Sequence, residues 1–218
     1  MNNEYIPIVT NREKQENYQL YTDRIAYYAK KGLDFIKSRK GIIEKAGNLH
    51  GSILEVGCGN GYTTLPLTRA GYNFTSIDMD IEALKKTALS LAHEEFLKNV
   101  KFYVMDALNM GFKDKIFNNV ICVNLLHHIE NKNSVLTEIN RILCDKGKVI
   151  IADFNIKGME IVDGVHKEEG RVHENFGISE EETCAFFDKS GYQIKKYDEI
   201  CHWILVASKS SGGKNVFA

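Results

Sequence analysis

Apolar residues follow two alternating patterns through the middle of the chain. Short apolar runs of strand length occupy residues 53–56, 73–77, 100–105, 117–124 and 148–154. Between them, apolar residues recur at helical spacing, most clearly over residues 81–92 and 131–143. Strands that alternate with helices in this way predict an α/β fold, in which a mostly parallel sheet is covered by helices on both faces.

The N-terminal residues break this alternation. Residues 1–9 show no periodicity and are expected to form an irregular arm. Thr10 and Glu13 have the spacing of a capping box, which predicts the start of a helix. Tyrosines then recur at helical spacing as far as Gly32, where a break or kink is expected. We therefore expect residues 1–48 to form a helical cap before the first strand of the sheet.

The C-terminal third departs from the alternation as well. Residues 155–177 are polar and rich in glycine, which predicts a lid or mobile loop. A capping box at the start of residues 178–209 predicts a helix, and the runs at 192–197 and 202–207 are expected to pair as an antiparallel hairpin at the sheet edge. Residues 210–218 are expected to be a disordered tail. With the five central runs, this predicts a single domain built as a three-layer sandwich around a seven-stranded sheet.

Three glycines mark the turn after the first strand. Gly57, Gly59 and Gly61 stand at alternate positions, and the first turns of a helix follow them. A strand, a glycine loop and a helix form one half of a nucleotide-binding βαβ unit, in which glycine lets a ligand lie against the backbone. The second and third strands end in Asp78 and Asp106. Because the carboxyl ends of parallel strands meet at one edge of the sheet, we expect these groups to surround one ligand.

In these features, residues 52–154 resemble the cofactor-binding core of a class I S-adenosylmethionine-dependent methyltransferase. The family's signature, an acidic residue, any residue and then Gly-x-Gly-x-Gly, stands here as residues 55–61, and its second- and third-strand acids match Asp78 and Asp106. The proline that the family often carries before the fifth strand is absent. A helix before the first strand commonly closes over the cofactor, so residues 1–48 are a candidate cover. The resemblance implies a Rossmann-like fold, S-adenosylmethionine as cofactor and methyl transfer as the activity.

The resemblance also assigns roles to single residues. The backbone of the glycine loop lies beside the methionine part of the cofactor, and Asn124 meets its amino group. Asp78 accepts the ribose hydroxyls, and Met79 packs beside the adenine. Asp106 accepts from the adenine amino group, and Ala107 offers its amide to the ring. The implied cofactor-binding residues are Glu55, Gly57, Cys58, Gly59, Asn60, Gly61, Asp78, Met79, Asp106, Ala107, Asn124 and Leu125.

Two other functions fit parts of the pattern. A nicotinamide dinucleotide (NAD(P))-dependent oxidoreductase also uses this βαβ unit, but its fingerprint needs glycine at the third position after Gly59, where Tyr62 stands. It also gives no reason for Asp106. A non-catalytic subunit that binds S-adenosylmethionine and regulates a partner carries the same motifs, and the sequence leaves that alternative open.

Composition narrows the class of acceptor. The chain of 218 residues carries 28 basic and 29 acidic residues, without the basic excess typical of a nucleic-acid-binding protein. A local basic cluster, which includes Lys37, Arg39 and Lys40, is interrupted by acids and is interpreted as a solvated helix face. Where methyltransferases of nucleic-acid amino groups often carry Asn/Asp-Pro-Pro-aromatic, residues 124–127 read NLLH. We therefore expect a small-molecule acceptor and no nucleic-acid partner.

The cysteines and the hydropathy of the chain indicate the cellular compartment of the protein. The five cysteines stand singly, without a CxxC pair, and no apolar run reaches the length of a membrane span. Without a signal peptide, an odd number of cysteines fits a reducing compartment. We expect a cytoplasmic protein without membrane contact, and the sequence leaves its oligomeric state open.

Five histidines fall where an acceptor is expected. Two follow the fourth strand, two lie in the lid candidate and one begins the last strand: His127, His128, His166, His173 and His202. His127 is the first candidate for a general base, because an unperturbed histidine pKa of about 6.5 suits proton transfer near neutrality. His127, His166 and His173 are the expected lining of the acceptor site. Alternatively, His166, His173 and a third group hold a metal ion, but six intervening residues are not a recognised zinc spacing, so no metal site is assigned.

Overall fold

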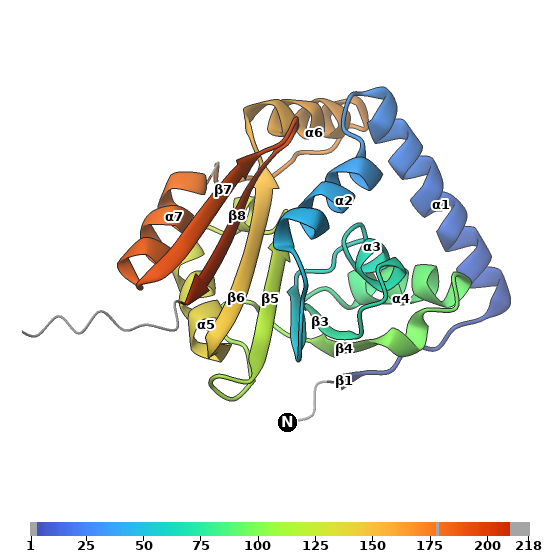
Figure 1. Ribbon diagram of the computed structural model, residues 1–218. Coiled ribbons are helices and arrows are strands. Elements are labelled where there is room, and N and C mark those ends of the chain that lie inside the picture. The colour runs from blue at the N-terminus through green and yellow to red at the C-terminus, as the bar shows by residue number, and fades with distance from the viewer. Residues whose placement is uncertain (1–3, 178, 210–218) are drawn as a thin grey trace, which may run out of the picture.

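Helices cover both faces of one twisted sheet in the computed structural model, which describes residues 4–177 and 179–209 (Figure 1). The sheet has eight strands in the order β1-β4-β3-β2-β5-β6-β8-β7. Their bounds are β1 Glu4–Tyr5, β2 Ile53–Val56, β3 Phe74–Asp78, β4 Val100–Val104, β5 Phe117–Val123, β6 Leu143–Phe154, β7 Tyr192–Asp198 and β8 His202–Lys209. The strands β4, β3, β2, β5 and β6 pair in parallel, and β8 and β7 extend the sheet in antiparallel pairing. The mostly parallel sheet and its antiparallel edge hairpin are thus confirmed.

The first strand corrects one expectation. The sequence predicts an irregular arm over residues 1–9 and seven strands, but Glu4 and Tyr5 pair with Tyr103 and Phe102 and form an eighth strand. Two residues are too short to leave a periodic pattern. The pairing arises because the edge of β4 offers backbone groups that need partners.

Apart from α6 (Ile156–Glu168), the helices lie close to the predicted positions. Their bounds are α1 Asn11–Lys30, α2 Phe35–Ala46, α3 Thr64–Arg69, α4 Ile81–His93, α5 Lys132–Ile142, α6 Ile156–Glu168 and α7 Glu180–Lys189, with 3-10 turns η1 Leu97–Asn99 and η2 Leu126–His128. The Thr10 hydroxyl accepts the backbone N–H of Glu13 at 3.2 Å and donates to the Glu13 carboxylate at 2.7 Å, so Thr10 caps α1 as predicted. None of the helices in the described ranges has the length and apolar character needed to cross a bilayer.

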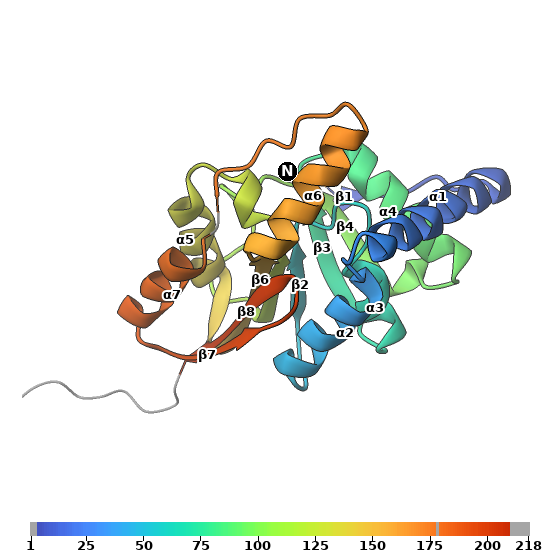
Figure 2. The ribbon, with the colours of Figure 1, turned by 90° about the horizontal axis from the view of Figure 1, so that it is seen from above.

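Two apolar clusters form the core, one on each face of the sheet. Side chains of α1, α2, α3, α4 and α6 share one cluster, and those of α5 and α7 share the other. Figure 2 shows α5 and α7 on one side of the strands and α1, α2, α3 and α4 on the opposite side. The three-layer arrangement follows from the alternation of strands and helices in the sequence.

Helix α6 corrects a second expectation. The sequence predicts a lid or loop over residues 155–177, but a helix occupies Ile156–Glu168 and only the residues after it are irregular. Asn155 caps this helix by accepting the N–H of Gly158 at 3.0 Å, and three apolar residues recur along its buried face: Met159, Val162 and Val165. Gly158 is required there because a Cβ would collide with a carbonyl group of the neighbouring loop. A glycine at position 158 is therefore explained by this tertiary contact and does not indicate a loop.

Helix α1 is fastened to the end of α6. Arg24 forms an ion pair with Glu169, the residue that follows α6, and the Lys31 ammonium lies 2.6 Å from Glu168. The Tyr27 hydroxyl also donates to Glu168. In Figure 1, α1 and α6 meet above the carboxyl ends of the central strands. The helical cap therefore reaches the sheet edge at which parallel α/β proteins bind ligands. The predicted tail at residues 210–218 lies outside the described residues.

Candidate active site

The glycine loop turns sharply between β2 and α3. Gly57, Gly59 and Gly61 have positive φ angles of 80°, 51° and 80°, which other residues rarely adopt. A Cβ at Gly57 would come within 3.1 Å of the Leu125 side chain, whereas the space beside Gly59 is open. The N–H of Gly59 donates to Asp78 Oδ2 at 2.9 Å, so the end of β3 holds the loop in place. The loop therefore presents bare backbone to the sheet edge.

Glu55 supports this loop from within the protein. It is 1% exposed, and its Oε2 accepts from the hydroxyls of Thr64 at 2.8 Å and Ser76 at 2.7 Å, which joins β2 to α3 and β3. Burial raises the pKa of Glu55 to about 7, although both hydroxyl donors act in the opposite direction. The hydrogen bonds of this carboxylate are with Thr64 and Ser76, so its direct contact with a cofactor stays a prediction.

The two strand-end acids lie on neighbouring strands. Asp78 ends β3, which pairs with β4, and Asp106 follows β4 by two residues. One oxygen of each carboxylate accepts a local backbone N–H, at 3.0 Å for Asp78 and 2.8 Å for Asp106. Met79 is 70% exposed and Ala107 is half-buried beside them. Both carboxylates keep free lone pairs that can accept further hydrogen bonds. The roles of Asp78 at the ribose and of Asp106 at the adenine stay predictions.

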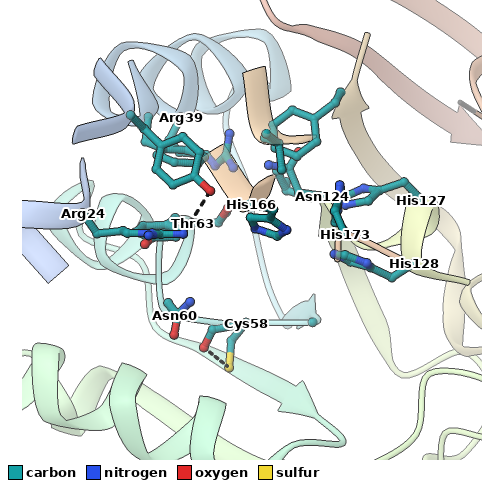
Figure 3. Close-up of a pocket in the computed structure, with 18 of the residues that line it drawn as sticks. Arg24, Arg39, Cys58, Asn60, Thr63, Asn124, His127, His128, His166 and His173 are labelled. Atoms are coloured by element: carbon teal, nitrogen blue, oxygen red, sulfur yellow. Dashed lines mark hydrogen bonds between the residues drawn. The ribbon is translucent and has the colours of Figure 1, made fainter. Parts of the chain in front are cut away.

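A pocket opens between this loop and the end of β5 (Figure 3). The loop contributes residues 57–60 to its lining, and α1 and α2 contribute Tyr28 and Phe35. Asn124 stands at the end of β5 with a φ of 55°, and its Oδ1 is buried without a hydrogen-bond partner in the described part of the chain. A buried amide oxygen is costly to leave unpaired, so this atom is suited to accept a hydrogen bond from a ligand.

Arg39 also lines the pocket, in a role that the sequence did not indicate. The sequence pattern assigns it to a solvated helix face, but it is 2% exposed and shares the buried face of α2 with Phe35 and Ile42. Its Nη1 contacts Ser38 Oγ and His202 Nε2 at 3.1 Å each, and its Nε has no partner among residues 4–177 and 179–209. Burial lowers the pKa of Arg39 to about 10. The available signal was its helical spacing from Phe35 and Ile42.

Two histidines of η2 form the wall opposite the glycine loop. His127 and Asp153 are each 2% exposed, and His127 Nδ1 lies 2.5 Å from Asp153 Oδ1. The ring of His128 packs against that of His127, with centroids 3.9 Å apart. Burial away from water and, to a smaller extent, the neighbouring His127 lower the pKa of His128 to about 4. His128 is therefore neutral at physiological pH.

Two more histidines reach the same wall from α6 and the loop after it. The rings of His166 and His173 lie 4.7 Å apart between centroids, and that of His173 lies 5.3 Å from His127 and 5.1 Å from His128. The structure thus brings together four of the five histidines that the sequence singled out. His202 instead contacts α2 through Ser38. His127, His166 and His173 line one pocket, and their contact with an acceptor stays a prediction.

The comparison with known families identifies the family of the chain. A family described as a methyltransferase domain matches residues 48–202. The chain belongs to this methyltransferase family. The fold that it adopts is the class I, Rossmann-like fold of S-adenosylmethionine-dependent methyltransferases. The oxidoreductase alternative is therefore not supported, in agreement with Tyr62 at the position where that fingerprint needs glycine.

The chain is also similar to individual methyltransferases. A ubiquinone biosynthesis O-methyltransferase of Rickettsia akari is 32% identical over 104 residues, which are 47% of this chain and 40% of the relative. The chain thus matches less than half of that relative's length. The Thermotoga maritima structure described as a possible histamine N-methyltransferase has a TM-score of 0.64 at 16% identity and covers 88% of this chain and 97% of its own. The phosphoethanolamine N-methyltransferase 2 of Haemonchus contortus, in complex with S-adenosyl-L-methionine, has a TM-score of 0.63 at 15% identity over 80% and 53% of the two chains.

Proposed function

We propose that the protein transfers the methyl group of S-adenosylmethionine to a nucleophilic atom of a small molecule. The single observation that carries this proposal is the pocket, because it has the glycine loop on one side and the histidines on the other. The pocket therefore offers a cofactor side and an acceptor side within one cavity. The names of the relatives, a ubiquinone biosynthesis O-methyltransferase among them, fit a small acceptor.

The cofactor side has the groups that S-adenosylmethionine requires. The unpaired Oδ1 of Asn124 is suited to accept from the α-ammonium group, and the buried guanidinium of Arg39 is suited to bind the α-carboxylate. Asp78 keeps lone pairs for the ribose hydroxyls. When bound, the cofactor supplies a methyl group on a sulfonium, which departs as a neutral thioether.

The chain's own residues then hold the reactants in line and exclude water. The ion pair between Arg24 and Glu169 joins α1 to the end of α6 beside the pocket. The rings of Phe35 and Tyr62 stack with centroids 4.6 Å apart and form an apolar wall. A direct displacement needs no protein nucleophile, so alignment in a dry pocket supplies much of the catalysis.

On the acceptor side, His127 is the residue that we expect to meet the nucleophile. The carboxylate of Asp153, 2.5 Å from Nδ1, favours the tautomer with the proton on Nδ1. The lone pair of His127 is therefore on Nε2. A regulatory subunit without turnover would use the same cofactor side, and only a turnover measurement separates the two functions.

We also propose a cytoplasmic location and no nucleic-acid partner. The five cysteines, all within the described residues, are free thiols, which fits a reducing compartment. A net charge of −1 gives no electrostatic reason for binding nucleic acid.

Calorimetric titration tests the cofactor half of the proposal. We expect binding of S-adenosylmethionine and S-adenosylhomocysteine and none of NADH. Arg39→Met should weaken S-adenosylmethionine binding by about 1.5–3 kcal/mol, the value of a hydrogen bond to a charged group. Lys40→Met removes the same charge from the exposed face of the same helix and should leave the affinity unchanged. Tight NADH binding without a response to S-adenosylmethionine contradicts the proposal.

A screen for turnover tests the acceptor half. Metabolite mixtures are incubated with methyl-labelled S-adenosylmethionine, and label is sought in small products by mass spectrometry. Transfer to a small molecule supports the enzyme. Tight cofactor binding without transfer to small molecules favours the regulatory subunit, and transfer to added nucleic acid or protein contradicts the acceptor class.

A further inference from the structure

The geometry points to a site for a divalent transition-metal ion of the zinc class, held by His127, His128 and His173. One possible ligand atom from each of the three residues lies within 4.8 Å of the other two. Figure 3 shows the three rings gathered on the side of the pocket away from Asn60 and Cys58. The sequence alternative for a metal was His166, His173 and a third group, whose spacing is not a zinc pattern, whereas the structure groups His173 with His127 and His128.

The second nitrogen of each ring is already engaged by an oxygen. Taking the three histidines in chain order, Nδ1 lies 2.5 Å from Asp153 Oδ1, 3.0 Å from the carbonyl oxygen of Glu174 and 2.6 Å from Asp163 Oδ1. Each Nδ1–H therefore donates to an acceptor, and each Nε2 keeps its lone pair. Zinc-bound histidines almost always show this arrangement, in which an outer oxygen fixes the tautomer and the orientation of the ring.

The surrounding charges suit a dication. Asp153 is 2% exposed, and beyond the His127 ring its oxygens accept only backbone N–H groups, those of His127 at 3.0 Å and Phe154 at 2.8 Å, among the described residues. Asp163 adds a second carboxylate behind His173. Two carboxylates next to the ligand rings offset a charge of +2, and the buried guanidinium of Arg39 also interacts with the Asp153 charge.

Three imidazoles leave one position of a tetrahedral ion open. With Zn–N bonds of about 2.0–2.1 Å, tetrahedral geometry places the nitrogens about 3.3 Å apart, so modest rotations of the rings close the site. Three protein ligands and an open position are the arrangement of catalytic rather than structural zinc sites. His166 lies beside His173, and its Nδ1 is buried without a partner in the described ranges. It can therefore hydrogen-bond the group that occupies the open position.

A role for the ion in methyl transfer rests on the proposed function, whereas metal binding does not. With the ion bound, Nε2 of His127 is a ligand rather than the base, and an acceptor hydroxyl or thiol in the open position would lose its proton to solvent, because a bound dication lowers its pKa. The acceptor oxygen or sulfur then forms its bond to the methyl carbon as the carbon–sulfur bond of the sulfonium breaks. The products are the methylated acceptor and S-adenosylhomocysteine.

Metal content and affinity test the site without any cofactor. Untagged protein is analysed by inductively coupled plasma mass spectrometry, and Zn²⁺ is titrated in competition with a chromophoric chelator. We expect one equivalent of Zn²⁺. Asp163→Asn should weaken binding by about 10- to 100-fold, as outer partners of zinc ligands do, and His128→Ala and His173→Ala should weaken it by at least as much. His50→Ala, at an exposed histidine outside the pocket, should change nothing.

Spectroscopy and folding controls complete the test. Co²⁺ in the site should give the intense visible absorption of a four-coordinate ion, and His173→Ala should abolish it. Thermal melts of the metal-free variants establish that the substitutions leave the fold intact. The site is overturned if Zn²⁺, Co²⁺, Ni²⁺ and Cu²⁺ all fail to bind at one equivalent, or if His128→Ala and His173→Ala bind as tightly as the wild type. Because no S-adenosylmethionine is present, these results are independent of the titration that tests cofactor binding and of the screen that tests methyl transfer.

Discussion

The two sides of the pocket are built in opposite ways. The backbone of the cofactor side is one local stretch, residues 57–63, which turns at three glycines and is held by Asp78, and Asn124 and Arg39 add side chains to it. The acceptor side draws on η2, on α6 and on the loop after α6, which meet only in the folded protein. His128, for example, is held by the carbonyl oxygen of Glu174, 46 positions further along the chain.

The two sides therefore differ in how freely their side chains can be replaced. Bare backbone offers the same N–H groups whatever the neighbouring side chains are, so a glycine loop serves one cofactor with little change. The acceptor side is made of side chains on separate elements, and each can be replaced without disturbing the loop. We infer that acceptor choice is set by the non-local side, and four predictions test the separation.

The largest effect is expected on the acceptor side. With the acceptor found by the labelling screen, His127→Ala should lower kcat by about 10²- to 10⁴-fold, because the Nε2 lone pair that serves as base or metal ligand is lost. The Kd of S-adenosylmethionine, measured by calorimetry, should change by no more than about twofold. A parallel fall of kcat and cofactor affinity would show that the two sides are not separate.

The support beneath the loop should respond to pH. Because burial raises the pKa of Glu55 to about 7 from an ordinary value of 4.5, the folded protein keeps a proton that the unfolded chain releases between these pH values. The contribution of Glu55 to the free energy of unfolding therefore falls as pH rises from about 4.5 to 7, by as much as about 3 kcal/mol, and is constant above that. Urea unfolding of wild type and Glu55→Gln across this window measures the difference. Glu160→Gln, on the exposed face of α6, should follow the wild type, and a Glu55→Gln curve parallel to both would contradict the assignment.

A third effect is expected at the end of β3. Asp78→Ala should weaken S-adenosylmethionine binding by about 1.5–3 kcal/mol, since it removes an acceptor for the ribose and the bond that holds Gly59. Zinc affinity at the histidines should be unaffected. Calorimetry gives both constants, and Asp198→Ala, an exposed aspartate on β7, is the matched control. Unchanged cofactor affinity in Asp78→Ala would remove this residue from the cofactor site.

The smallest effect is expected where α1 meets α6. Arg24→Gln breaks the half-buried ion pair with Glu169 and should weaken cofactor binding by about 0.2–1 kcal/mol, because the cover over the pocket opens more readily. Arg12→Gln breaks an exposed pair on the same helix and should leave the affinity unchanged. If calorimetry and hydrogen exchange of α1 find the two variants alike, the closing role of this helix is wrong.

The sequence determined the sheet, the glycine loop and the two strand-end acids. These features depend on local chemistry: apolar runs of strand length, glycines that allow positive φ, and carboxylates placed at the ends of parallel strands. The start of helix α1 was likewise predicted, because its capping contact joins Thr10 to Glu13, only three residues along the chain. The strand β1 was not, since two residues carry no period and pair only because an edge is open.

The sequence singled out the histidines, but only the tertiary structure decided how they come together and where Arg39 lies. The glycines of residues 155–177 pointed to a loop, but packing against the sheet turns most of the first half into α6 and brings His166 and His173 to His127. A basic residue on a charged helix is normally solvated. Arg39 is buried because it lies on the face of α2 that packs into the protein beside the pocket. The physical reason is the same in both places: burial and side-chain convergence depend on which elements meet, and a local pattern of residue types does not specify that.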